Sequence, residues 1–94
     1  MEKHYEIFTV TMNPAIDETI YIYDFVPGSV NRVEKFVRHA GGKGINTASF
    51  LADFGLPVLS TGFLGTANTA LFEEFFHEKQ IGDSFIRIDG HTRT

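Results

Sequence analysis

The chain has 94 residues, of which 43% are hydrophobic and ten are phenylalanine, so it is long enough for one small folded domain and too apolar for a disordered chain. Twelve acidic and eight basic residues give a net charge of -4, which provides no broad positive field for nucleic acid. The lack of cysteine excludes a disulfide scaffold, and no apolar run approaches the ~20 residues of a membrane-spanning helix, so we expect a cytoplasmic protein without nucleic acid or membrane partners.

The first part of the chain predicts three strands. Residues 5–12 are almost all apolar, aromatic or threonine, which is typical of a strand buried on both faces of a parallel sheet. After an Asn-Pro pair, residues 15–23 alternate between apolar and more polar side chains, as a half-exposed strand does. A Pro-Gly pair at 27–28 predicts a turn, and residues 30–39 alternate again, which indicates a second exposed strand.

The rest of the chain alternates between helix and strand. Residues 44–54 carry apolar side chains at helical spacing and end before Gly55, which predicts a helix with a glycine stop. Asn68 or Thr69 is a plausible cap for an amphipathic helix whose apolar stripe is rich in phenylalanine. Short apolar runs at 57–65 and 84–88 predict strands. This order indicates an α/β fold with a mostly parallel sheet.

The sequence "GGKGIN" at 41–46 follows a predicted strand and opens a predicted helix. Glycines let backbone N–H groups approach a ligand, and a helix N-terminus favours an anion, with Lys43 as its countercharge. A P-loop requires glycine where Val37 stands and a dinucleotide loop requires glycine where Thr47 stands, so neither pattern matches. Two interpretations remain open, an anion-binding loop and a flexible connection with a solvated lysine.

Three further side chains are candidates for a ligand site. Asp17 follows the first strand, and ligands of α/β sheets bind beyond the carboxyl ends of strands. Asn46 can offer a donor and an acceptor, and Arg93 can clamp a phosphate. Each has a plainer alternative as a solvated or locally capping residue. The four histidines lack metal-ligand spacing, so we expect no protein-built metal site.

Five segments in order, "TMNPAIDETI", "PGSVNRVE", "GGKGIN", "GFLG" and "RIDGHTRT", resemble the N-terminal part of the ribokinase-like PfkB carbohydrate kinases. The resemblance implies a sandwich with a parallel central sheet and flanking helices. It also implies a small β-sheet lid, with strands near 16–23 and 30–38, that pairs two subunits into a homodimer. The implied reaction is ATP-dependent phosphorylation of fructose 1-phosphate to fructose 1,6-bisphosphate, with tagatose 6-phosphate as the alternative substrate.

The resemblance also implies roles for individual residues. It makes Asp17 the acceptor for sugar hydroxyls, puts Lys43 near the sugar's phosphate, and makes Arg93 a second group that holds the phosphorylated sugar. The lining of the same pocket would include Gly41, Gly42 and Asn46.

The family's catalytic base and most of its site for ATP and Mg²⁺ belong to a C-terminal part that residues 1–94 do not contain. We therefore expect a sugar-binding segment that is inactive alone, since phosphoryl transfer needs both the base and charge stabilisation. A non-catalytic sugar-phosphate-binding or oligomerisation module is the alternative from another class. A dinucleotide binder is disfavoured by Thr47.

Overall fold

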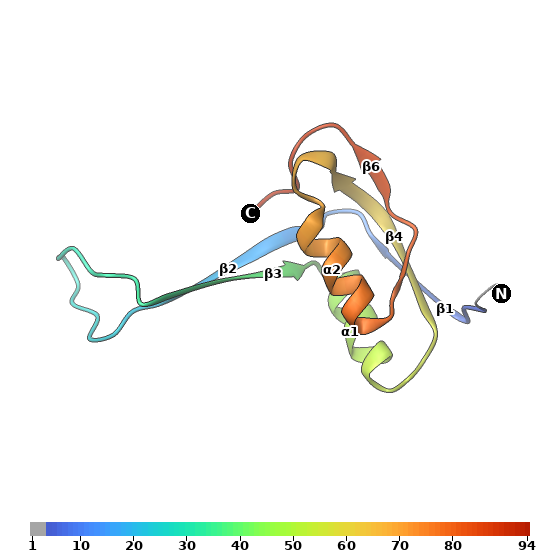
Figure 1. Ribbon diagram of the computed structural model, residues 1–94, viewed down its shortest axis with the longest axis horizontal. Coiled ribbons are helices and arrows are strands. Elements are labelled where there is room, and N and C mark those ends of the chain that lie inside the picture. The colour runs from blue at the N-terminus through green and yellow to red at the C-terminus, as the bar shows by residue number, and fades with distance from the viewer. Residues whose placement is uncertain (1–3) are drawn as a thin grey trace.

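The computed structural model describes residues 4–94, and its elements alternate as the sequence predicts. The first three are strands, one helix separates them from a fourth strand, and a second helix leads to two short strands (Figure 1). In chain order they are β1 (Ile7–Thr11), β2 (Ala15–Tyr21), β3 (Lys35–Gly41), α1 (Lys43–Asp53), β4 (Val58–Gly65), the 3₁₀ helix η1 (Thr66–Asn68), α2 (Ala70–Lys79), β5 (Gly82–Asp83) and β6 (Ile86–Ile88).

The main sheet is parallel and has β4 at its centre. β1 pairs with one edge of β4 in parallel, from Ile7 opposite Val58 to Thr11 opposite Gly62. β5 and β6 pair with β4 in succession, also in parallel. Parallel neighbours need a crossover, and α1 and α2 provide it. The predicted α/β class and parallel sheet are confirmed.

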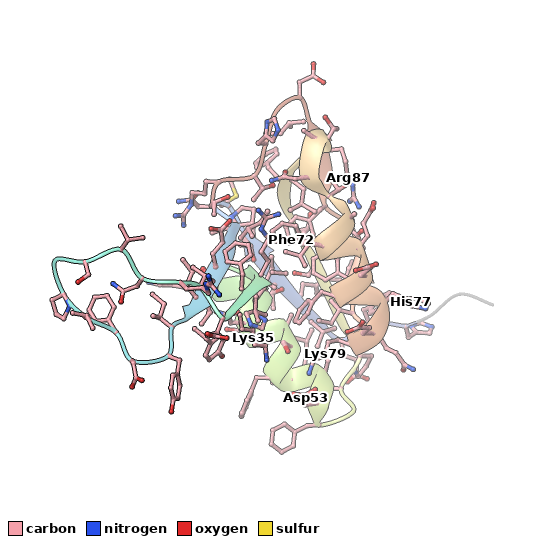
Figure 2. All side chains as sticks on the ribbon, turned by 60° about the vertical axis from the view of Figure 1, so that its left-hand side comes forward. Lys35, Asp53, Phe72, His77, Lys79 and Arg87 are labelled. Atoms are coloured by element: carbon pink, nitrogen blue, oxygen red, sulfur yellow. The ribbon has the colours of Figure 1, made fainter. Side chains whose placement is uncertain are left out.

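The core lies between this sheet and the two helices, which cover the same face (Figure 1). Ile45 and Ala48 of α1, Val58 of β4 and Phe72 of α2 are fully buried. Phe76 stacks on Phe85 with ring centroids 5.3 Å apart. At the ends of the helices, Lys79 donates to Asp53 over 2.9 Å, and the two side chains lie close together in Figure 2. The apolar side chains that recur at helical spacing in the sequence therefore pack together as one layer.

The expectation that β1 is buried on both faces is wrong. Phe8 is 64% exposed and Val10 is 60% exposed, whereas Thr9 and Thr11 between them are buried. Within residues 4–94 both helices lie on the face that carries Thr9 and Thr11, so Phe8 and Val10 point from the other face, which no described helix covers.

β2 and β3 form a separate antiparallel hairpin that projects from the α/β body (Figure 1). Its pairing runs from Ala15 opposite Gly41 to Tyr21 opposite Lys35. The predicted strand at 30–39 is therefore wrong at its start, because residues 30–34 belong to the loop of the hairpin. Asn31 shapes that loop by accepting from Val26 N–H and donating to Val26 and Ser29 carbonyls.

The predicted cap of α2 is correct in position and wrong in chemistry. Thr69 is the N-cap residue, but its side chain makes no capping hydrogen bond. The Asn68 side chain instead bonds to the backbone of Thr92. The helix stop at Gly55 is confirmed, with a φ of 79°. No helix within residues 4–94 is long and apolar enough to cross a membrane.

Candidate functional site

A cavity of about 560 Å³ opens where β1 ends, at the base of the hairpin and the start of α1. Three chain segments far apart in sequence contribute to it, and among its lining residues are five of the six predicted site residues. These five are Asp17, Gly42, Lys43, Asn46 and Arg93. The cavity lies beyond the carboxyl end of a parallel strand, where open α/β sheets bind their ligands.

The sixth residue, Gly41, lies beneath the Asp17 carboxylate. A Cβ placed on Gly41 would collide with Asp17 Oδ2 and would lie 2.9 Å from Asp17 Cγ. Gly41 pairs with Ala15 at the base of the hairpin, so the carboxylate of Asp17 folds back over the last residue of β3. The glycine is required here for space, and its absent side chain lets the carboxylate face the cavity.

The N-terminus of α1 forms the opposite wall of the cavity. Gly42 is the N-cap residue with a φ of 126°, and no side chain caps the helix there. The first helical bond runs from Asn46 N–H to the Gly42 carbonyl over 2.8 Å, so the N–H groups of the preceding turn stay available to a ligand. Lys43 is the first helical residue and its side chain is exposed. Backbone donors and one cation thus face the same space.

Arg93 reaches the cavity from the far end of the chain. Its backbone forms an isolated parallel bridge to Ala15, and its carbonyl accepts from Ile16 N–H over 2.7 Å. Its guanidinium lies against Asn13, with Nε donating to Asn13 Oδ1 over 2.8 Å. The segment after β6 therefore runs beside the base of the hairpin and delivers a second cation.

The local charge of this site opposes that of the whole chain. Lys43 and Arg93 supply two cations against the single carboxylate of Asp17 among the lining residues, while the chain carries -4 overall. The arrangement suits a ligand with hydroxyls near Asp17 and an anionic group near the cations. In the part of the chain that the structure describes, no three His, Asp or Glu side chains gather as a metal site.

Two lining residues were missed at the sequence level. The Thr11 hydroxyl is buried and has no hydrogen-bond partner among residues 4–94, and it lies against Gly44, where any Cβ would collide with it. Asn13 contacts Arg93. The sequence placed Asn13 within the segment "TMNPAIDETI" that carries the family resemblance but gave it no role, because a contact across 80 residues leaves no local pattern.

A second hollow, of about 550 Å³, lies on the hairpin and has a different character. Tyr21, Ile22, Tyr23 and Glu34 line it. It has aromatic surface and a carboxylate but no cation, so it does not suit a phosphorylated ligand.

The sequence matches the family described as pfkB family carbohydrate kinase over residues 10–94. A curated relative named 1-phosphofructokinase, from Xanthomonas campestris pv. campestris, is 47% identical over 89 residues, which are 95% of this chain and 28% of the relative. A curated relative named tagatose-6-phosphate kinase, from Staphylococcus epidermidis, is 39% identical over 93% of this chain and 28% of its own length. The chain thus spans about 28% of the length of these relatives.

Among solved structures, phosphofructokinase-2 from Escherichia coli in complex with fructose-6-phosphate has a TM-score of 0.82. The match covers 96% of this chain and 30% of that one at 22% identity. At this identity the likeness concerns the fold alone.

Proposed function

The chain belongs to the pfkB family of carbohydrate kinases, and on this premise we propose that it forms the sugar-phosphate site of a fructose 1-phosphate kinase. The proposed reaction transfers the γ-phosphoryl group of ATP to the 6-hydroxyl and yields fructose 1,6-bisphosphate and ADP. The observation that carries the proposal is one cavity that joins Asp17, Lys43 and Arg93. The name of the relative at 47% identity supports the choice of sugar.

Each predicted site residue has a role in this proposal. Asp17 accepts hydrogen bonds from sugar hydroxyls, and Gly41 leaves the space that its carboxylate needs. Lys43 and the N-terminus of α1 hold the phosphate, to which Arg93 adds a guanidinium. Gly42 and Asn46 complete the wall. Together these residues bind and orient the sugar.

The proposal assigns ATP, Mg²⁺ and the catalytic base to a part of the enzyme outside residues 4–94. Among the described residues that line the cavity, Asp17 is the only carboxylate, and Mg²⁺ usually requires several oxygen ligands. The described residues therefore do not fit a magnesium site. We infer that residues 4–94 are inactive alone and act within a longer cytoplasmic enzyme.

The hairpin supports a further part of the proposal, a homodimer in which the β2–β3 strands of two copies cover each other. Its exposed apolar side chains are unusually many for so few residues. They are Ile20, Tyr21, Tyr23, Phe25, Val26, Val30, Val33 and Phe36. Sedimentation of the complete protein tests this, and a monomer at all concentrations would contradict it.

Substitution Lys43→Ala in the complete protein tests the site. Loss of a charged hydrogen-bond partner should weaken fructose 1-phosphate binding by about 10- to 100-fold and leave ATP affinity within about twofold. Lys79→Ala is the matched control, because Lys79 lies at the end of α2, does not line the cavity and, among the described residues, makes only an exposed ion pair with Asp53. Equal loss of affinity for sugar and ATP would contradict the assignment.

Tagatose-6-phosphate kinase activity is the second candidate, and the 39% identical relative of that name favours it. The ratio of kcat/KM for fructose 1-phosphate and tagatose 6-phosphate separates the two. Binding of either sugar phosphate without turnover in the complete protein would instead support a non-catalytic module.

A further inference from the structure

Among the described residues, the Arg93 guanidinium bonds to Asn13 alone, a residue that the sequence did not assign to the site. Its Nε donates to Asn13 Oδ1 over 2.8 Å, and its Nη2 donates to the Asn13 carbonyl over 3.4 Å. Asn13 lies in the short connection between β1 and β2 and lines the same cavity. Both acceptors therefore come from one residue of this connection, 80 residues away in sequence.

This contact fixes which edge of the guanidinium faces a ligand. A guanidinium has five N–H donors in a planar fork. Asn13 occupies the edge formed by Nε and one N–H of Nη2. The other edge, formed by Nη1 and the second N–H of Nη2, has no partner among the described residues and can donate two parallel hydrogen bonds to an oxyanion.

The backbone at Arg93 is held independently of Asn13. The Asn68 carboxamide accepts from Thr92 N–H over 2.7 Å and donates to the Thr92 carbonyl over 3.0 Å. The Thr92 hydroxyl is buried and accepts from Gly65 N–H over 2.9 Å. Because the Arg93 carbonyl also accepts from Ile16 N–H, the main chain is fixed on both sides. Only the long side chain of Arg93 is then free to change rotamer, and its hydrogen bonds to Asn13 restrict that freedom.

We propose that Asn13 is a positioning residue that presets the Arg93 guanidinium for the phosphate group of the sugar. The inference rests on the proposed function and adds how one of its cations is oriented. An exposed arginine loses much rotamer freedom when it binds, and a side chain already held in place loses less on binding. Removal of Asn13 should therefore weaken sugar-phosphate binding through Arg93 alone.

The first experiment is a double-mutant cycle in the complete protein, with fructose 1-phosphate affinity measured by calorimetry. Asn13→Ala should weaken binding about fivefold to tenfold in the wild-type background. In the Arg93→Ala background the same change should alter affinity by less than about twofold, because the group that Asn13 orients is gone. An equal loss in both backgrounds would mean that Asn13 acts without Arg93 and would overturn the inference.

The second experiment needs no sugar and separates this inference from the proposed function. Solvent exchange of the Arg93 Nε–H proton is followed by ¹⁵N NMR, with the signal assigned by its loss in Arg93→Ala. Exchange should be slow in the wild type, faster in Asn13→Ala, and slow again in Asn13→Asp, which keeps the acceptor oxygen. Unchanged exchange in Asn13→Ala would overturn the inference, whereas a wild type that binds no sugar phosphate would overturn the proposed function.

Discussion

The α/β body and the hairpin are ordered by different forces, although both are built from similar side chains. Phe72 in the body is fully buried, whereas Phe36 on the hairpin is 46% exposed and Tyr21 is 51% exposed. The hairpin contacts the body mainly at its base, where Ile16 and Ala40 join the core cluster. Burial of apolar surface therefore holds the body, while a ladder of backbone pairs holds the hairpin. The candidate site lies where the two regions meet.

Removal of one phenylalanine from each region is the strongest test of this difference. Phe72→Ala creates a cavity between α2 and the sheet and should lower the free energy of unfolding by about 3–5 kcal/mol. In the single chain, Phe36→Ala removes a ring that is already half in water and lies 5.2 Å from Arg38, so at protein concentrations where the protein is monomeric the loss should stay below about 1 kcal/mol. Urea denaturation of both variants, followed by circular dichroism, measures the two values.

Similar losses in the two variants would contradict the comparison. They would mean that the Phe36 ring is buried in the state that unfolds, as in a dimer that covers the hairpin. Repetition of the Phe36→Ala measurement over a range of protein concentrations distinguishes these cases, because only a dimer makes the midpoint depend on concentration.

The two regions also differ in how well the sequence predicted them. The apolar spacing around Ile45 predicted both ends of α1 to within one residue, and the spacing around Phe72 predicted that the phenylalanine stripe lies in the core. Both predictions succeed because each helix buries one face against the sheet. On the hairpin, the alternation at 30–34 looked like a strand, but strand assignment depends on a partner. The ladder ends at Tyr21 opposite Lys35, and local pattern does not contain that register.

For the site, sequence reasoning found the side chains with strong local chemistry and missed those that act through distant contacts. Lys43 and Asn46 stand in a glycine-rich helix entrance, Asp17 follows a strand and Arg93 is a guanidinium suited to phosphate, and the family resemblance then gave all four a common ligand. Asn13 has no local signal, because its partner is 80 residues away. Asn68 was read as a cap, and only the folded backbone reveals its bonds to Thr92.

Two asparagines offer a smaller test of the same comparison. Asn68 in the body makes two hydrogen bonds to the Thr92 backbone, and Asn31 on the hairpin makes three to its own loop. Asn68→Ala leaves the N–H of buried Thr92 without its partner and should lower the free energy of unfolding by about 1–2 kcal/mol. In Asn31→Ala the backbone groups that Asn31 bonded can bond to water instead, so the free energy of unfolding should fall by less than about 0.5 kcal/mol.

Thermal and urea unfolding of both asparagine variants measure this prediction. A larger loss from Asn31→Ala than from Asn68→Ala would show that the loop of the hairpin, and not the segment that carries Arg93, limits the stability of the fold.

The smallest expected difference concerns ion pairs. In the body, Arg87 donates to Asp83 Oδ2 over 2.7 Å and to Glu73 Oε2 over 2.8 Å, with Asp83 and Arg87 side chains 25% and 30% exposed. On the hairpin, Arg38 lies 3.3 Å from Glu18, and its side chain is 59% exposed. The hydrogen bond from Arg87 lowers the pKa of Asp83 below its ordinary value of 3.8, against the opposing effect of burial.

A carboxylate whose pKa is lowered by folding stabilises the folded state above its unfolded pKa and loses that effect as the pH falls through the folded value. Asp83→Asn should therefore lower the free energy of unfolding by less than about 1 kcal/mol at pH 7, and the difference in this free energy between the variant and the wild type should become smaller below about pH 4. Urea midpoints at pH 7, 5 and 3 measure this. The hairpin control is Glu18→Gln at pH 7, which should change the free energy of unfolding by less than about 0.5 kcal/mol. A gap between Asp83→Asn and wild type that widens in acid would mean that the network around Arg87 does not stabilise the body.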